Sequence, residues 1–186
     1  MLWPKAIRAA VKVGADREIV SAYPYRNACP TSVWTDLIDS AEKSITFAGY
    51  TNYFLWQEQS RLTERLKTKA SAGCQIRFLI GDPDSEVTRR REKVEAVPLT
   101  VGTRIRITLD ALDRMGAVEG LEARFSDEHI ALSVFSFDDE MLVTPHLSSL
   151  LGHESPMLHL RRLGPDGLYD RFAGHVAALW EGGRPA

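Results

Sequence analysis

The chain has 186 residues, of which 44% are hydrophobic and 26% are charged, so it can bury one good core but is too short for two ordinary domains. Lysine and arginine total 23 against 25 acidic residues, and a net charge of −2 excludes bulk attraction to a phosphate backbone or an anionic membrane. The two cysteines have no CxxC spacing, and no apolar stretch approaches about 18 residues. The sequence therefore predicts a cytoplasmic domain without a disulfide framework or a membrane span.

The first half of the chain predicts alternating helices and strands. Residues 1–22 are expected to form a lead-in, and residues 23–186 the domain itself. Apolar residues at helical spacing, short apolar runs and Gly or Pro punctuation then define each element. In order, these are a helix from Pro30 to Ala41 capped by Thr31 or Ser32, a buried strand at 44–50, a helix at 57–72 that Gly73 ends, a strand at 75–80, a turn at 81–85 and a charged helix through Arg91.

The second half changes from this alternation to a hairpin. The predicted elements are a helix at 100–116, a strand at 121–126, a hairpin with arms at 131–137 and 141–144, a strand at 156–163 and a closing helix from 168 to 180. Strict alternation in the first arm and a polar turn at 138–140 indicate the hairpin. We expect an α/β fold with a mixed sheet, in which parallel strands precede an antiparallel hairpin and helices cover both faces.

Five short strings run through nearly the whole chain in a fixed order. They lie at 2–4 (LWP), 23–34, 81–85 (GDPDS), 137–143 (FDDEMLV) and 158–162 (LHLRR). Together they resemble the phospholipase D-like superfamily, specifically the single-copy domain at the C-terminus of bacterial helix-turn-helix regulators of the xenobiotic-response-element type. In such regulators the LWP string follows the DNA-binding module. The resemblance therefore implies an effector domain that lacks its DNA-binding module. It also implies that this domain forms a homodimer, with the apolar hairpin as a plausible contact surface.

Catalytic members of that superfamily carry His-x-Lys-x4-Asp just before a hairpin turn. When the aspartate is aligned with Asp138, Ala131 takes the histidine position and Ser133 the lysine position. An alanine cannot attack phosphorus, and a serine has no permanent charge for phosphate. Shifting the register to His129 recovers one residue of three. We therefore expect a domain that binds rather than cuts.

Ligands of open α/β sheets bind at the carboxyl ends of parallel strands. The candidates there are Tyr50, Asn52 and Trp56 after the first strand, and Asp82 and Asp84 after the second. The aromatic residues can wall a pocket for a planar or sugar-like ligand, or pack in the core. The two aspartates equally suit a turn and a helix cap. Arg104 and Arg106 can clamp an anion with bidentate hydrogen bonds.

His146 follows the hairpin, where catalytic relatives line the phosphate site, although a lone histidine there is often structural. No histidine pair has metal-ligand spacing, so no metal or cofactor is predicted. Two functions remain. One is a ligand-sensing and dimerisation domain of a transcription regulator, which reaches DNA only through a helix-turn-helix module, attached or absent. The other is an enzyme acting on a phosphorylated or nucleotide-like small molecule through His146, oriented by Asp138 or Asp139.

Overall fold

One mixed sheet of eight strands organises the molecule, for which a computed structural model describes residues 15–147 and 150–186. The strands lie in the order β1-β7-β6-β5-β2-β3-β4-β8. Their bounds are β1 Ile19–Tyr23, β2 Ser44–Ala48, β3 Gln75–Gly81, β4 Leu121–Ser126, β5 Leu132–Phe137, β6 Glu140–Pro145, β7 Met157–Arg161 and β8 Arg184–Pro185. Strands β2, β3 and β4 are parallel, whereas β5, β6, β7 and β1 pair antiparallel. The predicted change from parallel strands to a hairpin is confirmed.

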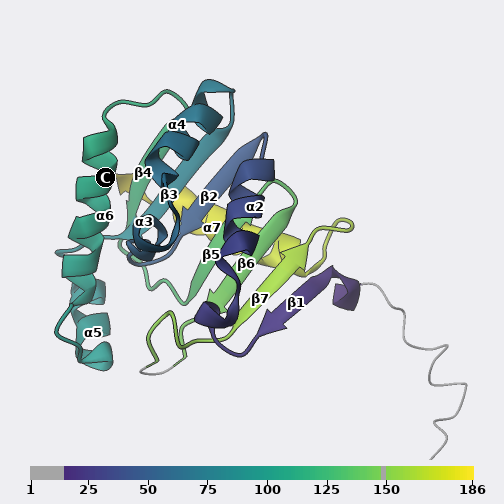
Figure 1. Ribbon diagram of the computed structural model, residues 1–186. Helices are drawn as coiled ribbons and strands as arrows, with labels where there is room; N and C mark the ends of the chain where they lie inside the picture. Colours follow the sequence, from purple (N-terminus) through teal and green to yellow (C-terminus); the bar gives the residue numbers. More distant parts are fainter. Residues whose placement is uncertain (1–14, 148–149) are drawn as a thin grey trace, which may run out of the picture.

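Helices cover both faces of this sheet (Figure 1). Their bounds are α2 Thr31–Ser40, α3 Phe54–Glu58, α4 Leu62–Ser71, α5 Glu86–Glu95, α6 Val101–Met115 and α7 Leu168–Glu181. In the view of Figure 1, α2, α3 and α4 lie in front of the sheet, α7 lies behind it, and α5 and α6 stand beside β4. Within the described residues, no helix is long and apolar enough to cross a membrane.

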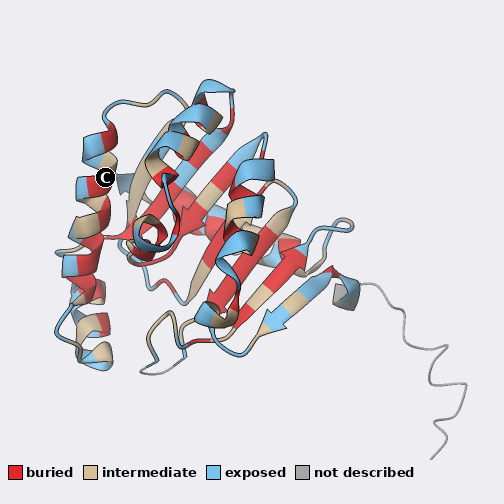
Figure 2. Ribbon diagram, in the orientation of Figure 1, coloured by how far each residue is buried: buried red, intermediate tan, exposed pale blue. Residues whose placement is uncertain are grey.

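Alternation along β2 divides the interior into two cores. Ile45 and Phe47 point toward α2, α3 and α4, while Ala48 points toward α7. The ring of Phe47 lies 4.9 Å from that of Phe78 and 6.5 Å from that of Phe135. Full burial of such side chains stabilises the fold by roughly 1.5–3 kcal/mol each. The buried residues therefore concentrate in the central strands, as Figure 2 shows.

Several predicted features differ from the structure. Residues 19–22 belong to β1, which pairs with β7, so the sheet begins inside the expected lead-in, whose residues 1–14 lie outside the described part. The helix expected at 57–72 is two helices, because Arg61 between them has a left-handed φ of 56°. The predicted hydroxyl cap of α2 is wrong, since Pro30 precedes the helix and no side chain caps it.

The hairpin also differs from its expected role as a dimer surface. Strand β5 pairs with β2 on one side and β6 pairs with β7 on the other, so the hairpin is in the interior of the sheet. Val134, Phe135, Leu142 and Val143 are at most 1% exposed. The prediction that this hairpin can form the dimer surface is therefore wrong.

A buried carboxylate joins the start of the described chain to α7. Glu18 ends a short 3-10 helix, Ala15–Glu18, and is 2% exposed. It accepts the backbone N–H of Leu163 (3.3 Å) and of Tyr169 (3.0 Å) at the first turn of α7. A side chain at position 167 would collide with Glu18, because a Cβ on Gly167 would come within 2.2 Å of its Oε1. At Tyr169, Glu18 thus satisfies one of the N–H groups that the first turn of α7 leaves without a partner in the helix, and at Leu163 it binds the chain that precedes α7.

Candidate functional site

A small cavity lies where the carboxyl ends of β2 and β3 meet α5 and α6. We call it the arginine cleft. It is lined by Arg26, Tyr50, Thr51, Asn52, Tyr53, Phe54, Arg91, Glu95, Arg104, Ser133, His146, Gly152 and His153. Its volume is about 40 Å³, which is room for a few water molecules and far below the roughly 300–1,000 Å³ of a typical small-molecule pocket. In this structure, side chains therefore fill most of the space that the strand ends enclose.

Two residues after β2 shape the floor of the cleft. Gly49 must lack a side chain, because a Cβ there would come within 2.8 Å of the Ser133 Oγ. Asn52 has a left-handed φ of 53° and is buried. Its amide donates to the carbonyls of Phe47 (3.2 Å) and Leu79 (3.5 Å). Asn52 therefore lines the cleft, while its amide nitrogen holds the turn between two strands.

His146 is a neutral imidazole in this cleft. Its Nε2 lies 2.8 Å from the Ser133 Oγ, and its ring stacks on Tyr50 with centroids 5.7 Å apart. Burial, followed by the positive charge of Arg91, lowers the pKa of His146 to about 4 from an ordinary 6.5. The backbone of Ile130 partly opposes this shift, but no hydrogen bond to the described residues satisfies Nδ1.

Tyr50 forms the wall behind His146. Its hydroxyl is 2.8 Å from Nδ1 of His129 and accepts the backbone N–H of Ile130 at 3.2 Å. Burial raises the pKa of this phenol above its usual range. Tyr50 is therefore a fixed, uncharged wall, and His129, although exposed, helps to hold it.

Three arginines and one carboxylate supply the charge of the cleft. The Glu95 carboxylate pairs with Arg91 Nε at 2.9 Å and also with Arg104, and these side chains are only 7–9% exposed. The guanidinium of Arg26 lies 3.6 Å above the centre of the Phe54 ring and 3.7 Å from Glu58. Burial lowers the Arg26 pKa, and its Nε makes no hydrogen bond to the described residues. The lining thus carries an excess of positive charge.

The positions that align with the catalytic pattern lie at the two ends of the hairpin. Ser133, at the lysine position, lines the cleft, and the carbonyl of Ala131 accepts the His146 backbone N–H at 2.9 Å. Asp138 lies at the turn, about 17 Å away along the six residues of β5. The predicted orientation of His146 by Asp138 or Asp139 is therefore wrong.

Asp138 instead holds the chain that enters β2. Its carboxylate accepts the backbone N–H groups of Glu42 (2.7 Å), Lys43 (3.0 Å) and Ser44 (2.8 Å). Partial burial tends to raise the Asp138 pKa, but these hydrogen bonds outweigh it and the pKa is lowered. Its φ of 50° suits the tight turn. Asp138 is therefore a structural residue.

The remaining candidates lie outside the cleft. Trp56 stacks on Phe78 in the core with centroids 5.6 Å apart. Asp82 accepts the backbone N–H of Asp84 at 2.8 Å and pairs with Arg184, which fits the turn interpretation. Asp84 forms an exposed ion pair with Arg106 at 2.6 Å. Of the residues predicted to bind ligand, Tyr50, Asn52, Arg104 and His146 are the ones that line the cleft.

Three charged residues of the cleft, Arg26, Arg91 and Glu95, were not predicted. A run of charges such as Arg89 to Arg91 is most often a solvated helix face, so it does not by itself point to a buried site. Helical spacing carried a usable signal, because Arg91 and Glu95 are four residues apart and must share one face. For Arg26 the one indication was its place in the string 23–34, which said nothing of its direction.

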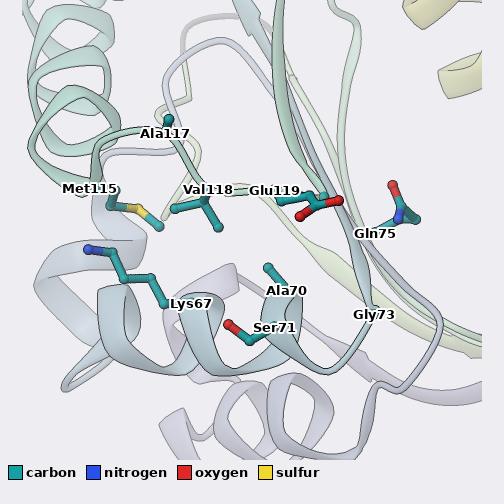
Figure 3. A pocket seen from close by; sticks show the side chains of 10 residues that line it. Lys67, Ala70, Ser71, Gly73, Gln75, Met115, Ala117, Val118 and Glu119 are labelled. Carbon is teal, nitrogen blue, oxygen red and sulfur yellow. The ribbon is translucent and has the colours of Figure 1, made fainter.

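A larger hollow than the arginine cleft lies at the other end of the sheet. It has a volume of about 550 Å³ and lies between the C-terminal end of α4 and the chain from α6 to β4. Figure 3 shows that its lining mixes Lys67 and Glu119 with small and apolar side chains. Within the described residues, no group of three or more His, Cys, Asp or Glu side chains could hold a metal ion. Charged side chains converge in the arginine cleft rather than in this hollow.

No family model matches the chain, and no curated protein matches it in sequence. Its fold, however, is similar to solved structures. The archaeal chromatin protein TrmBL2, described as binding DNA in a novel mode, has 13% identity and a TM-score of 0.53 over 98% of this chain and 59% of its own. Phosphatidylserine synthase of Haemophilus influenzae Rd KW20 has 14% identity and a TM-score of 0.52, over 83% of this chain and 36% of its own.

A further neighbour is Nuc from Salmonella typhimurium, a phospholipase D family member, with 15% identity and a TM-score of 0.48, over 83% of this chain and 89% of its own. The match to TrmBL2 spans about three fifths of that protein's length. These identities define the fold alone. The chain has the predicted mixed α/β fold, and it shares this fold with TrmBL2 and with the phosphatidylserine synthase.

Proposed function

We propose that this chain is a ligand-sensing and dimerisation domain of a transcription regulator, which binds an anionic small molecule without cleaving it. The observation that carries the proposal is the arginine cleft. Its lining has three arginines against one carboxylate, and it has Ser133 at the position aligned with the catalytic lysine. Such a lining attracts an oxyanion but supplies no charged nucleophile.

The regulatory part of the proposal draws support from the fold. TrmBL2, over 98% of this chain, is a DNA-binding chromatin protein, and 41% of it lies outside the matched region, which covers 59% of it. We propose that this domain likewise acts beside a separate helix-turn-helix module and reaches DNA only through it. A net charge of −2 fits a domain that does not itself grip the phosphate backbone.

We propose that the homodimer forms through the edge of the sheet at β1. Among the described residues this strand pairs only with β7, and it carries Ile19 and Val20, which are 41% and 44% exposed. An apolar edge strand with open backbone groups is a ready pairing surface. Light scattering of the wild type and of Val20→Asp tests this, with a dimer expected for the first and a monomer for the second. A monomeric wild type overturns the dimer.

The ligand-binding proposal is tested by isothermal titration at constant ionic strength with inorganic phosphate, adenosine monophosphate and glucose 6-phosphate. We expect at least one probe to bind, and Arg104→Gln to weaken it more than tenfold. Arg106→Gln is the matched control, because Arg106 lies two residues away on the same helix but pairs with Asp84 outside the cleft. Absence of binding to any probe, or equal losses in both variants, overturns the proposal.

One observation favours the alternative, an enzyme acting on a phosphorylated or nucleotide-like small molecule through His146. Ser133 and His146 are 2.8 Å apart, as a nucleophile and its base are. A pKa of about 4 makes His146 a weak base, and no carboxylate in the described residues bonds its Nδ1. Release of phosphate from adenosine monophosphate or glucose 6-phosphate, abolished in Ser133→Ala, would establish the enzyme and overturn the sensor.

A further inference from the structure

We infer that Glu95 is a built-in counter-ion of the arginine cleft, and that a ligand's phosphate group binds by taking its place between Arg91 and Arg104. This inference rests on the proposed binding of an anion in the cleft. It adds which group the ligand displaces, which class of ligand fits, and how binding reaches the surface of the molecule.

Glu95 occupies the position that an anionic ligand would take. Its two carboxylate oxygens are divided between Arg91 Nε, at 2.9 Å, and Arg104. All three side chains are at least nine-tenths buried. The attraction within a buried ion pair is largely offset by the loss of hydration, so the pair adds little net stability. Removing Glu95 alone would be costly, but exchanging it for another anion is close to balanced.

Two further groups distinguish a phosphate from the Glu95 carboxylate. Arg26 and His146 both line this cavity, and Nε of the first and Nδ1 of the second are buried without a hydrogen-bond partner among the described residues. A buried polar group left without a partner is unfavourable, because it has lost its hydrogen bonds to water. The two oxygens of Glu95 are already engaged, whereas a phosphate group has a third terminal oxygen. His146 donates to it in the tautomer whose Nε2 accepts from Ser133.

The small cavity agrees with an exchange rather than with simple addition. A free volume of about 40 Å³ holds a few water molecules but not a phosphate ester. Withdrawal of the Glu95 carboxylate enlarges the space at the point where the guanidinium groups converge. The cleft then accommodates the phosphate group, and the rest of the ligand extends toward Gly152 and His153 at its rim.

Two features at the C-terminal end of α5 favour the release of Glu95 from the arginines. Glu95 is the last residue of the helix, where a negative charge is disfavoured by the helix dipole. Ala96, which follows, has a left-handed φ of 49°, a conformation that is unfavourable for an alanine. Release of Glu95 relieves both. The chain after α5 carries Leu99, which is 42% exposed, so occupation of the cleft changes an apolar part of the surface.

The test is titration of the wild type and Glu95→Gln with inorganic phosphate and with adenosine monophosphate. Glutamine keeps the shape of the side chain but no longer competes as an anion, so we expect at least tenfold tighter binding. Glu86→Gln is the matched control, because it removes the same charge from the exposed first turn of α5 and should leave the affinity unchanged. Comparison of the two probes distinguishes the sources of the phosphate group. Binding of inorganic phosphate indicates a site for the free ion, and binding of adenosine monophosphate alone indicates a site for a larger phosphorylated ligand.

The outcomes separate the two proposals. If the wild type binds a probe and Glu95→Gln binds it equally or more weakly, the exchange is wrong and the anion site remains. If neither protein binds any probe, the proposed function itself fails. Circular dichroism checks the fold of the variant. Should Glu95→Gln unfold, Glu95→Asp replaces it, because a carboxylate one methylene shorter holds the arginines less well and should tighten phosphate binding by a few fold.

Discussion

The two ends of the β5–β6 hairpin differ in what their polar residues do. At the turn, Asp138 keeps the residue of the catalytic pattern and binds three backbone N–H groups of the chain entering β2. At the open end, Ser133 and His146 hydrogen-bond each other within the arginine cleft. Asp138, which supports the fold, matches the aspartate of the catalytic pattern, whereas Ala131 and Ser133 stand where that pattern has histidine and lysine. An aspartate at this position can therefore be explained by its structural role alone.

The largest expected effect is at the turn. Asp138→Ala removes the acceptor of three backbone N–H groups, so we expect the free energy of unfolding to fall by about 3 kcal/mol, after a discount for partial exposure. Urea unfolding measures it. Asp139→Ala is the matched control, because its exposed side chain makes none of these bonds. A change below about 0.5 kcal/mol in Asp138→Ala would remove the structural role from the comparison.

The next effect is the pH dependence at the open end. Because the folded-state pKa of His146 is about 4, below its ordinary 6.5, the unfolded chain takes up a proton more readily. The stability that the neutral imidazole gives is complete above pH 6.5 and is lost as the pH falls toward 4. We expect a loss of about 2 kcal/mol between pH 7 and pH 5.

Urea titrations at several pH values measure this loss in the wild type and in His146→Asn. Asparagine cannot titrate, but it can still hydrogen-bond Ser133, so the variant should show a flatter profile over the same range. Identical profiles for the two proteins would mean that His146 is solvated and protonates normally.

The smallest effect concerns the wall of the cleft. Tyr50→Phe removes the hydroxyl that accepts the buried N–H of Ile130 and contacts His129. We expect a loss of about 1.5 kcal/mol in the free energy of unfolding, since one buried donor is left without a partner. Tyr53→Phe, at the same cleft, should be nearly neutral. Equal losses in the two variants would argue against a specific role for the Tyr50 hydroxyl.

Periodicity predicted most of the fold, because the residues that alternate or recur at helical spacing are those the cores bury. Ile45 and Phe47 are examples. The short edge strands β1 and β8 escaped prediction, since a strand paired on one side does not need a strong apolar pattern. The break at Arg61 was also hidden, because one left-handed residue other than glycine leaves no signature in the sequence.

The site was predictable only where topology decides position. Tyr50, Asn52 and His146 were placed correctly at the cleft because they follow strands whose ends meet there. Trp56 was not, because spacing alone does not determine whether a side chain at the start of a helix faces the core or a ligand. Arg91 was not predicted as a site residue, because it lies in a run of three arginines. Its spacing of four residues from Glu95 nevertheless places the two on one face of α5, and this face turns inward.

The buried carboxylate of Glu18 has a mechanical consequence. It couples the chain immediately before β1 to the first turn of α7, and α7 in turn packs across β4, β5, β6 and β7. The position of the chain that enters β1 is therefore tied through one carboxylate to a helix that lies across half of the sheet.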